Sequence, residues 1–337
     1  MAVNATTGLT ATFTERDVRK GVTETIALDT PVTSTVGKDP GPLTTTPEWE
    51  QKTFSARTNA GVIEAYEPVA GDYQNNLSNK NMLKGRFIKQ WRPVAVTKEA
   101  KLMHNQYNVA DLLADNVMDM SKVIYSDVEF TICSDTESVA PSAGATASSI
   151  RSIFRWLSKD DTRFTDTDTT PLDAWRTPAA NILVSKTNAS DVTESEIAGM
   201  ITSVATTRRK AGMRFMGLCT PLMRDQFDSF SRTDKSFTSS AYPVSRFAQT
   251  QGTINREVTL YKSSNGSVEL MTSFDLDSTV HFGLISPDLI RLGYAQGVMV
   301  NKEGASSQIE KRVIDVIYTL KNLHLGAHGK VITGATA

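Results

Sequence analysis

IEKRVIDVIYTLKNLHLGAHGKV, residues 309–331, opens with a long alternation of apolar and polar side chains. The apolar residues occupy every second position: Ile314, Val316, Tyr318 and Leu320. The positions between and beside them are mainly polar: Lys311, Asp315, Thr319 and Lys321. Successive side chains of a strand point to opposite faces of a sheet, so this period of two predicts a strand with one buried face. We interpret it as the closing strand of the fold.

Short motifs accompany this strand at both ends of the chain. Near the C-terminus they are Ser286-Pro287-Asp288-Leu289, Leu292-Gly293-Tyr294, Glu310-Lys311-Arg312 and Ala327-His328-Gly329. Near the N-terminus they are Asp29-Thr30-Pro31, Ser34, Val36-Gly37 and Glu48-Trp49. In these residues and their order the chain resembles a family of tailed-phage major capsid proteins. The middle of the chain matches only as a succession of element types.

The resemblance implies an α+β protein with the Hong Kong 97-type (Johnson) capsid fold. Its expected parts are an N-terminal arm with a short helix at 1–47, an extended hairpin loop at 48–97, a peripheral domain with a long spine helix at 98–180, an axial domain at 181–282, and return strands of the peripheral domain at 283–337. The implied function is a virion structural protein, which self-assembles into hexamers and pentamers that form an icosahedral head shell around a double-stranded DNA genome. An encapsulin-like compartment subunit is the alternative, and a soluble hydrolase or adhesin is a third reading.

The implied partners are further copies of the chain, a portal protein, scaffolding and decoration proteins, and packaged DNA held non-specifically on the inner face. A formal net charge of −1 predicts that any DNA contact is weak. The sequence contains no window of about 18 apolar residues, so no membrane-spanning helix is predicted, and residues 1–13 lack the features of a secretory signal. We expect assembly in the host cytoplasm and residence in the virion. Because no long charged helical leader is present, we expect a separate scaffold or none.

The N-terminal region predicts a helix followed by an extended arm. Thr14 and Asp17 form a capping pattern, and apolar residues repeat every fourth position through Ile26, which predicts a helix at 14–28. Residues 31–47 contain four prolines and two glycines, which disfavours regular structure.

Two strands are predicted at 49–58 and 86–97, separated by a polar tip at 61–85. A lone two-stranded hairpin is marginally stable in water, so we expect this one to lie on a neighbouring subunit. Packing within its own domain is the alternative. Deletion of the tip is expected to leave the body folded but to prevent stable shells. The basic residues along the second half either meet a neighbour's acidic residues or are solvated: Lys80, Lys84, Arg86, Lys89 and Arg92.

The strongest helical pattern spans 106–134, with one apolar stripe that includes Leu113, Val117, Ile124 and Val128. The resemblance makes this the spine helix. Residues 134–180 read as loops that flank a short helix within 150–157.

Regular elements then alternate. A capping pattern at Thr193–Glu196 begins a helix that we expect to end at Gly212, and a buried strand follows at 213–219. Thr220-Pro221 predicts the start of a helix through Phe230. Strands are predicted at 258–261, 268–272 and 280–285, with a turn at 264–266.

No constellation of residues predicts catalysis, so we propose no catalytic, cofactor-binding or metal-binding residue and expect no enzyme. Residues 326–330 lack the glycine and hydroxyl positions of a phosphate-binding P-loop. His324 and His328 have the spacing of a zinc pair but follow a strand. The cysteines, Cys133 and Cys219, read as buried thiols.

Two charged runs receive ordinary explanations. One run is acidic and contains Asp166, Asp168 and Asp173, whose clustered carboxylates could bind calcium. Because the loop lacks the sixth-position glycine and the twelfth-position glutamate of an EF-hand, a solvated turn is the preferred interpretation. The sequence leaves open whether loop 160–173 binds a cation. Arg208-Arg209-Lys210 falls in the last turn of a predicted helix, where cations interact favourably with the helix dipole.

Overall fold

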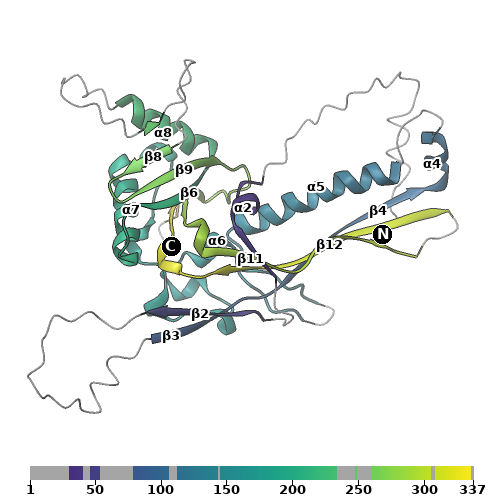
Figure 1. Ribbon diagram of the computed structural model, residues 1–337, viewed down its shortest axis with the longest axis horizontal. Coiled ribbons are helices and arrows are strands. Elements are labelled where there is room, and N and C mark those ends of the chain that lie inside the picture. Colours follow the sequence, from purple (N-terminus) through teal and green to yellow (C-terminus); the bar gives the residue numbers. More distant parts are fainter. Residues whose placement is uncertain are drawn as a thin grey trace, which may run out of the picture.

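The computed structural model describes residues 30–40, 46–53, 79–105, 112–142, 145–233, 247–248, 260–304 and 308–334. Within these residues the strands form three sheets, of four, seven and two strands (Figure 1). The helix predicted at 14–28 and residues 61–78 of the predicted hairpin tip lie outside the described residues.

The four-stranded sheet has the predicted closing strand near its centre. Its order is β1 (Gly37–Pro40), β11 (Ile290–Lys302), β12 (Ile309–Asn322) and β4 (Ile88–Thr97). β12 is antiparallel to both of its neighbours, and β1 runs parallel to β11. The predicted apolar face of β12 is confirmed, because Ile314, Val316, Tyr318 and Leu320 are all buried.

The opposite face of β12 is less exposed to solvent than the alternating pattern predicted. Asp315 and Thr319 are buried. Asp315 accepts hydrogen bonds from Gln296 and Asn301 and pairs with Lys89. Neighbouring strands therefore cover polar residues that the alternation alone assigns to solvent.

The expected hairpin pairing is wrong. β2 (Glu48–Thr53) pairs with β3 (Asn79–Lys84), whereas β4 pairs with β12, more than 200 residues away along the chain. The second arm of the hairpin is thus β3, and the predicted strand at 86–97 belongs to the four-stranded sheet. The base of the hairpin packs on its own body, because Trp49 and Leu83 are buried there.

The predicted spine helix is present as α5 (Leu112–Cys133), preceded by α4 (Lys98–Asn105). Figure 1 shows α5 lying along the four-stranded sheet, and it contacts β4 and β12. Its stripe of Leu113, Ile124, Val128 and Ile132 is buried. The amphipathic pattern therefore identified the correct inward face.

The proline-rich arm contains more regular structure than predicted. Pro31 occupies the first turn of α2 (Pro31–Thr35), where its missing N–H costs no hydrogen bond. β1 follows directly and joins the sheet edge beside β11. Residues 31–40 are thus fixed to the body.

The seven-stranded sheet gathers most of the remaining strands. Its order is β5 (Ile182–Leu183), β13 (Gly329–Ile332), β10 (Val280–Ile285), β6 (Met213–Cys219), β9 (Gly266–Thr272), β8 (Leu260–Ser263) and β7 (Phe247–Ala248). Ser264 and Asn265 make the predicted turn between β8 and β9. The expected domain boundary after 282 falls within β10, and β13 joins this sheet, so the domain limits stay a prediction.

Helices α7 (Glu194–Arg208) and α8 (Pro221–Thr233) pack on this sheet. Thr193 and Glu196 form the predicted capping box, and the Thr220 hydroxyl accepts a hydrogen bond from the Met223 N–H. α7 ends earlier than expected: Arg209, with φ 50°, adopts the left-handed conformation at its C-cap, so Gly212 does not end the helix.

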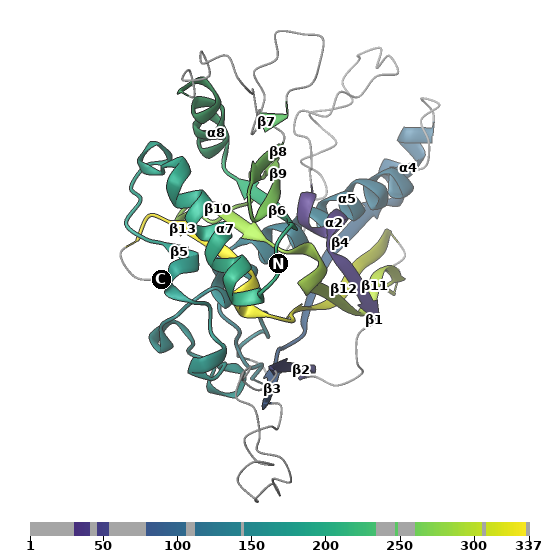
Figure 2. The same cartoon turned by 60° about the vertical axis from the view of Figure 1, so that its left-hand side comes forward.

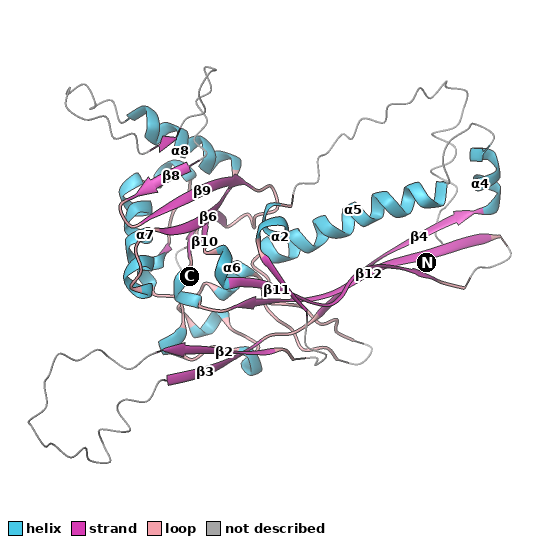
Figure 3. Cartoon of the chain, in the orientation of Figure 1, coloured by secondary structure: helices cyan, strands magenta, loops and turns pink. Residues whose placement is uncertain are grey.

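Residues 134–181 are mainly irregular, as predicted (Figure 3). They contain α6 (Ile153–Trp156) and four short 3₁₀ turns: η1 (Asp161–Arg163), η2 (Thr167–Thr169), η3 (Asp173–Trp175) and η4 (Ala179–Asn181). Further 3₁₀ turns within the described residues are η5 (Ala189–Asp191), η7 (Pro287–Leu289) and η8 (Leu325–Ala327).

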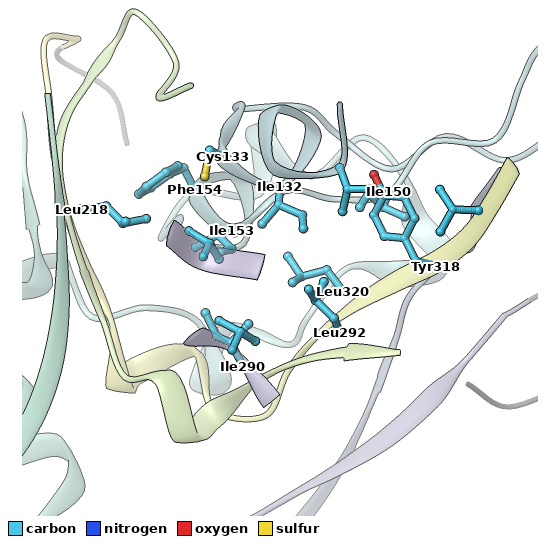
Figure 4. Packing of buried hydrophobic residues seen from close by; sticks show 14 of the residues in the cluster. Ile132, Cys133, Ile150, Ile153, Phe154, Leu218, Ile290, Leu292, Tyr318 and Leu320 are labelled. Carbon is cyan, nitrogen blue, oxygen red and sulfur yellow. The ribbon is translucent and has the colours of Figure 1, made fainter. Parts of the chain in front are cut away.

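Two hydrophobic clusters form the core. The first joins α5, α6 and the four-stranded sheet, and Figure 4 shows Ile132, Phe154 and Leu320 among its residues. The second lies among α7, α8 and the seven-stranded sheet, on the side where Figure 2 shows both helices. β6 contributes to both, with Leu218 in the first cluster and Phe215 in the second. The two halves of the protein therefore share a sheet.

Candidate assembly surfaces

The hairpin base has one buried and one exposed face. On the buried face the Trp49 indole N–H donates to the Asn322 carbonyl (2.8 Å), and its ring meets Trp156 edge-on at 5.9 Å. The exposed face carries two cross-strand ion pairs around Met82, which is 52% exposed: Lys80–Glu50 and Lys84–Glu48. This face is available to another molecule.

The five basic residues singled out along this segment all have acidic partners within the chain. Besides the two hairpin pairs, these are Arg86–Asp166, Lys89–Asp315 and Arg92–Asp127. The prediction offered two roles for these basic residues, contact with a neighbouring subunit or solvation. The ion pairs within the chain explain their presence without either role. Lys80 and Lys84 remain partly exposed, whereas Arg86 is buried.

The acidic loop faces arginines. Asp166 and Asp168 contact Arg86, and Asp173 pairs with Arg176. Burial raises the pKa of Asp166, but hydrogen bonds from Arg86 and Ser138 outweigh this effect and leave the pKa below its ordinary value. The preferred interpretation, a solvated turn, is wrong for Asp166. The arginines already supply the positive charge that a cation would bring.

Of the two histidines with the spacing of a zinc pair, His328 has a structural role. His328 is fully buried: its Nδ1 accepts from the Ser286 N–H (3.1 Å), so its Nε2 donates to Asn322 Oδ1 (3.1 Å). Desolvation lowers the pKa of His328 to about 3 and that of His324 to about 4. With both ring nitrogens occupied, neutral His328 has no lone pair left for a metal ion.

Gly329 explains why the Ala-His-Gly motif ends in glycine. A Cβ at this position would lie 2.5 Å from the Met200 sulfur and 2.7 Å from the Asn181 carbonyl oxygen. A side chain there would collide with the backbone of η4.

A buried carboxylate that the sequence did not single out anchors the arm. Glu129, on α5, accepts from the backbone N–H groups of Val32 and Thr33, both at 2.8 Å. Desolvation raises its pKa, although these hydrogen bonds oppose the rise. Glu129 sits beside apolar residues in the helical pattern, and a single carboxylate gives no local signal of such a contact.

Several exposed apolar residues lie on the four-stranded sheet and on α5, whereas others, such as Leu222 and Phe274, lie elsewhere. Trp91, Met118, Phe130 and Met299 are each more than half exposed. Trp91 and Phe130 border a groove of about 340 Å³, with its other lining residues Lys89, Gln90, Arg92, Asp127 and Thr131. Large exposed aromatic residues are typical of surfaces that bind other proteins.

The basic run 208–210 and the two cysteines complete the candidates. Arg208 lies in the last turn of α7, as predicted, whereas Arg209 is the C-cap residue and Lys210 follows the helix. Both cysteines are buried, and desolvation raises the pKa of each thiol. In the described ranges no group of three or more His, Cys, Asp and Glu side chains is placed to hold a metal ion. Among the same residues, no helix has the length and apolarity to cross a membrane.

Solved structures with similar folds are capsids and an encapsulin. The capsid of the cyanophage P-SCSP1u has 9% sequence identity and a TM-score of 0.62, covering 98% of this chain and 95% of that chain. The capsid of a native GTA particle has 8% identity and a TM-score of 0.57, covering 99% of each. The SrpI encapsulin of Synechococcus elongatus has 9% identity and a TM-score of 0.54, covering 99% and 96%. At these identities the likeness establishes the fold, which is of the predicted Hong Kong 97 type.

Comparison with curated proteins gives no match. The model of one protein family, described as SU10 major capsid protein, matches residues 5–336. This match covers nearly the whole chain, including both ends where the sequence motifs lie. The chain belongs to the SU10 major capsid protein family.

Proposed function

We propose that this major capsid protein builds the icosahedral head shell of a tailed phage from hexamers and pentamers of a single subunit. The observation that carries the proposal is the match to the SU10 major capsid protein family across residues 5–336. Repeated head-to-tail contacts between identical subunits close into rings when the rotation permits. The role is mechanical, and we propose no enzymatic activity.

The proposed parts follow the expected division of the chain. Residues 1–47 serve as the arm and the hairpin as the extended loop, while α5 forms the spine of the peripheral domain. Support for the hairpin's role comes from its described base: β2 and β3 pair along their whole length, and Trp49 and Leu83 are buried against the body. The shell would enclose double-stranded DNA and include a portal, and scaffolding and decoration proteins would assist assembly in the host cytoplasm.

The first experiment is negative-stain electron microscopy, with size-exclusion chromatography, of the purified chain. We expect polyhedral shells or capsomer rings. A strictly monomeric chain, also when expressed together with its genomic neighbours, would contradict the proposal.

A variant with a shortened hairpin tests the mechanism. The tip deletion expected from the sequence, 61–85, would also remove β3, so a better variant replaces residues 54–78 with Asn-Gly. This dipeptide favours the tight turn that joins two antiparallel strands. We expect a folded body, judged by circular dichroism, and at least tenfold fewer particles. Normal particles from this variant would refute the hairpin's role.

The encapsulin-like alternative rests on the same-fold match to the SrpI encapsulin. Nucleic acid inside particles isolated from the natural source supports the head shell, whereas an enclosed protein cargo supports the compartment.

A further inference from the structure

Residues 85–87 join the hairpin to the four-stranded sheet and are held from several directions. Three backbone groups of this junction are hydrogen-bonded to separate segments: the Gly85 N–H to the Pro47 carbonyl (2.9 Å), the Arg86 carbonyl to the Thr319 hydroxyl (2.8 Å), and the Phe87 carbonyl to the Ser148 hydroxyl (2.6 Å). Gly85 also lies against the Trp49 ring, because a Cβ at this position would be 3.1 Å from two ring carbons. The junction is therefore fixed where the chain changes from one sheet to the other.

The Arg86 side chain adds a charged contact to the acidic loop. Its Nε and Nη2 donate to the two carboxylate oxygens of Asp166 at 2.6 and 2.9 Å, and Nη2 also reaches Asp168 at 3.2 Å. The Arg86 and Asp166 side chains are only 10% and 8% exposed. A planar guanidinium that engages both oxygens fixes direction as well as distance, which a lysine ammonium cannot do.

The acidic loop is itself held in place. Arg151 donates to the Thr169 carbonyl and hydroxyl at 2.8 and 3.0 Å. Its guanidinium carbon lies over the rings of Trp156 and Phe164, at 4.5 and 4.6 Å from their centroids. Asp166 accepts a further hydrogen bond from the Ser138 hydroxyl. Arg86 therefore contacts a loop that is fixed to the first core.

We propose that the Arg86–Asp166 pair is a clamp that sets the direction in which the hairpin leaves the body, so that an unassembled subunit presents its hairpin already aimed at a neighbouring copy. Arg86 is thus a positioning residue for assembly. The inference rests on the proposed function. Its physical advantage is that ordering the hairpin beforehand lowers the entropy lost when two subunits bind.

The surroundings distinguish this role from general stabilisation of the hairpin. The hairpin base has contacts of its own with the body, because Trp49 and Leu83 are buried and the Trp49 indole N–H donates to the Asn322 carbonyl at the end of β12. These contacts keep β2 and β3 paired and packed without the clamp. The clamp adds a second, directional contact to the acidic loop, so its removal should widen the range of hairpin angles without unfolding the base.

The test measures hairpin direction separately from folding and assembly. Spin labels at Met82→Cys, on the exposed face of β3, and Lys311→Cys, on the exposed part of β12, report the angle, while the two native cysteines are buried. Labelled chains are diluted into excess unlabelled chain, so that only distances within one subunit contribute. We expect a single narrow distance distribution in the otherwise unsubstituted protein.

Arg86→Lys keeps the charge and removes the paired contact, so we expect a distribution at least twice as wide and at least tenfold fewer particles. Asp168→Asn, which alters one exposed contact and should fold normally, is expected to give intermediate widening. The matched control is Lys84→Gln, which breaks an exposed ion pair two residues away and should leave both readouts unchanged. Unfolding temperatures of all variants are measured in parallel.

Two results separate the proposals. Narrow distance distributions in both the Arg86→Lys and the Asp168→Asn variants would overturn the clamp. A lower unfolding temperature of Arg86→Lys, with the distribution still narrow, counts as the same result. If the unsubstituted chain forms no particles but the distributions widen as expected, the clamp stands and the proposed shell function fails.

Discussion

Lys330 is a buried lysine on β13, next to the edge strand β5 of the seven-stranded sheet. Its Nζ donates to the Phe154 carbonyl at 3.0 Å, and its side chain lies within the protein interior. Desolvation, together with the charges of Arg163 and Arg155, lowers its pKa from 10.5 to about 7. A lysine in this environment costs folding free energy whenever it is protonated.

The sign of the pH dependence follows from the lowered pKa. Between pH 7 and 10.5 the unfolded chain binds a proton that the folded chain has released, so the free energy of unfolding rises with pH across this window. Below pH 7 both states are protonated, and the folded state carries the full cost of the buried charge.

Lys330→Met should therefore stabilise the protein most at low pH. Methionine fills a similar volume without charge, so removing the buried charge should raise the free energy of unfolding by about 1–4 kcal/mol at pH 6. Loss of the hydrogen bond to Phe154 reduces this gain by roughly 1 kcal/mol. The gain should shrink towards pH 10. Denaturant unfolding at both pH values checks this, with the exposed Lys311→Met as control. An equal gain at both pH values would show that the charge of Lys330 is not what destabilises the fold.

At the scale of elements, the contact between α2 and α5 determines where the arm leaves the body. Glu129→Gln replaces one acceptor oxygen with an NH₂ group, which would then face the N–H of Val32 or Thr33. Each backbone hydrogen bond to a charged group is worth about 1.5–3 kcal/mol. We expect hydrogen exchange at these two amides to accelerate at least tenfold.

Asp119→Asn, an exposed substitution on the same helix, is the control for the Glu129 variant. It should leave the exchange of both amides unchanged. If Glu129→Gln also leaves them protected, the carboxylate does not anchor the arm.

Local signals in the sequence account for most single elements. The capping box predicted the start of α7, and the amphipathic stripe of α5 and the alternation in β12 identified their buried faces. These signals act over a few residues, within one turn or one strand. They succeed because burial imposes the same period on the sequence as on the backbone.

Pairing between distant segments could not be predicted in this way. The sequence at 86–97 identified a strand, but nothing local indicated that its partner is β12 and not β2. Arg86 and Asp166 are 80 residues apart, and each alone resembles an ordinary surface charge. The residues that fix the hairpin's direction therefore became identifiable only from the three-dimensional contacts.

At the scale of the whole molecule, the seven-stranded sheet belongs to both hydrophobic clusters. Along β6, Met216 and Leu218 point to the first cluster, while Phe215 and Cys219 point to the second. β10 divides in the same way, with Ile285 in the first and Phe282 in the second. Neither cluster can lose its packing without exposing one face of the shared strands.

This shared sheet predicts that the unassembled subunit unfolds in one cooperative transition. Leu320→Ala in the first cluster and Phe282→Ala in the second should each cost about 2–5 kcal/mol, because both side chains are buried. Calorimetry should show the same single transition moving to lower temperature in both variants, with near-UV and far-UV circular dichroism changing together. Two separate transitions, each sensitive to only one substitution, would mean that the clusters fold independently in spite of the strands they share.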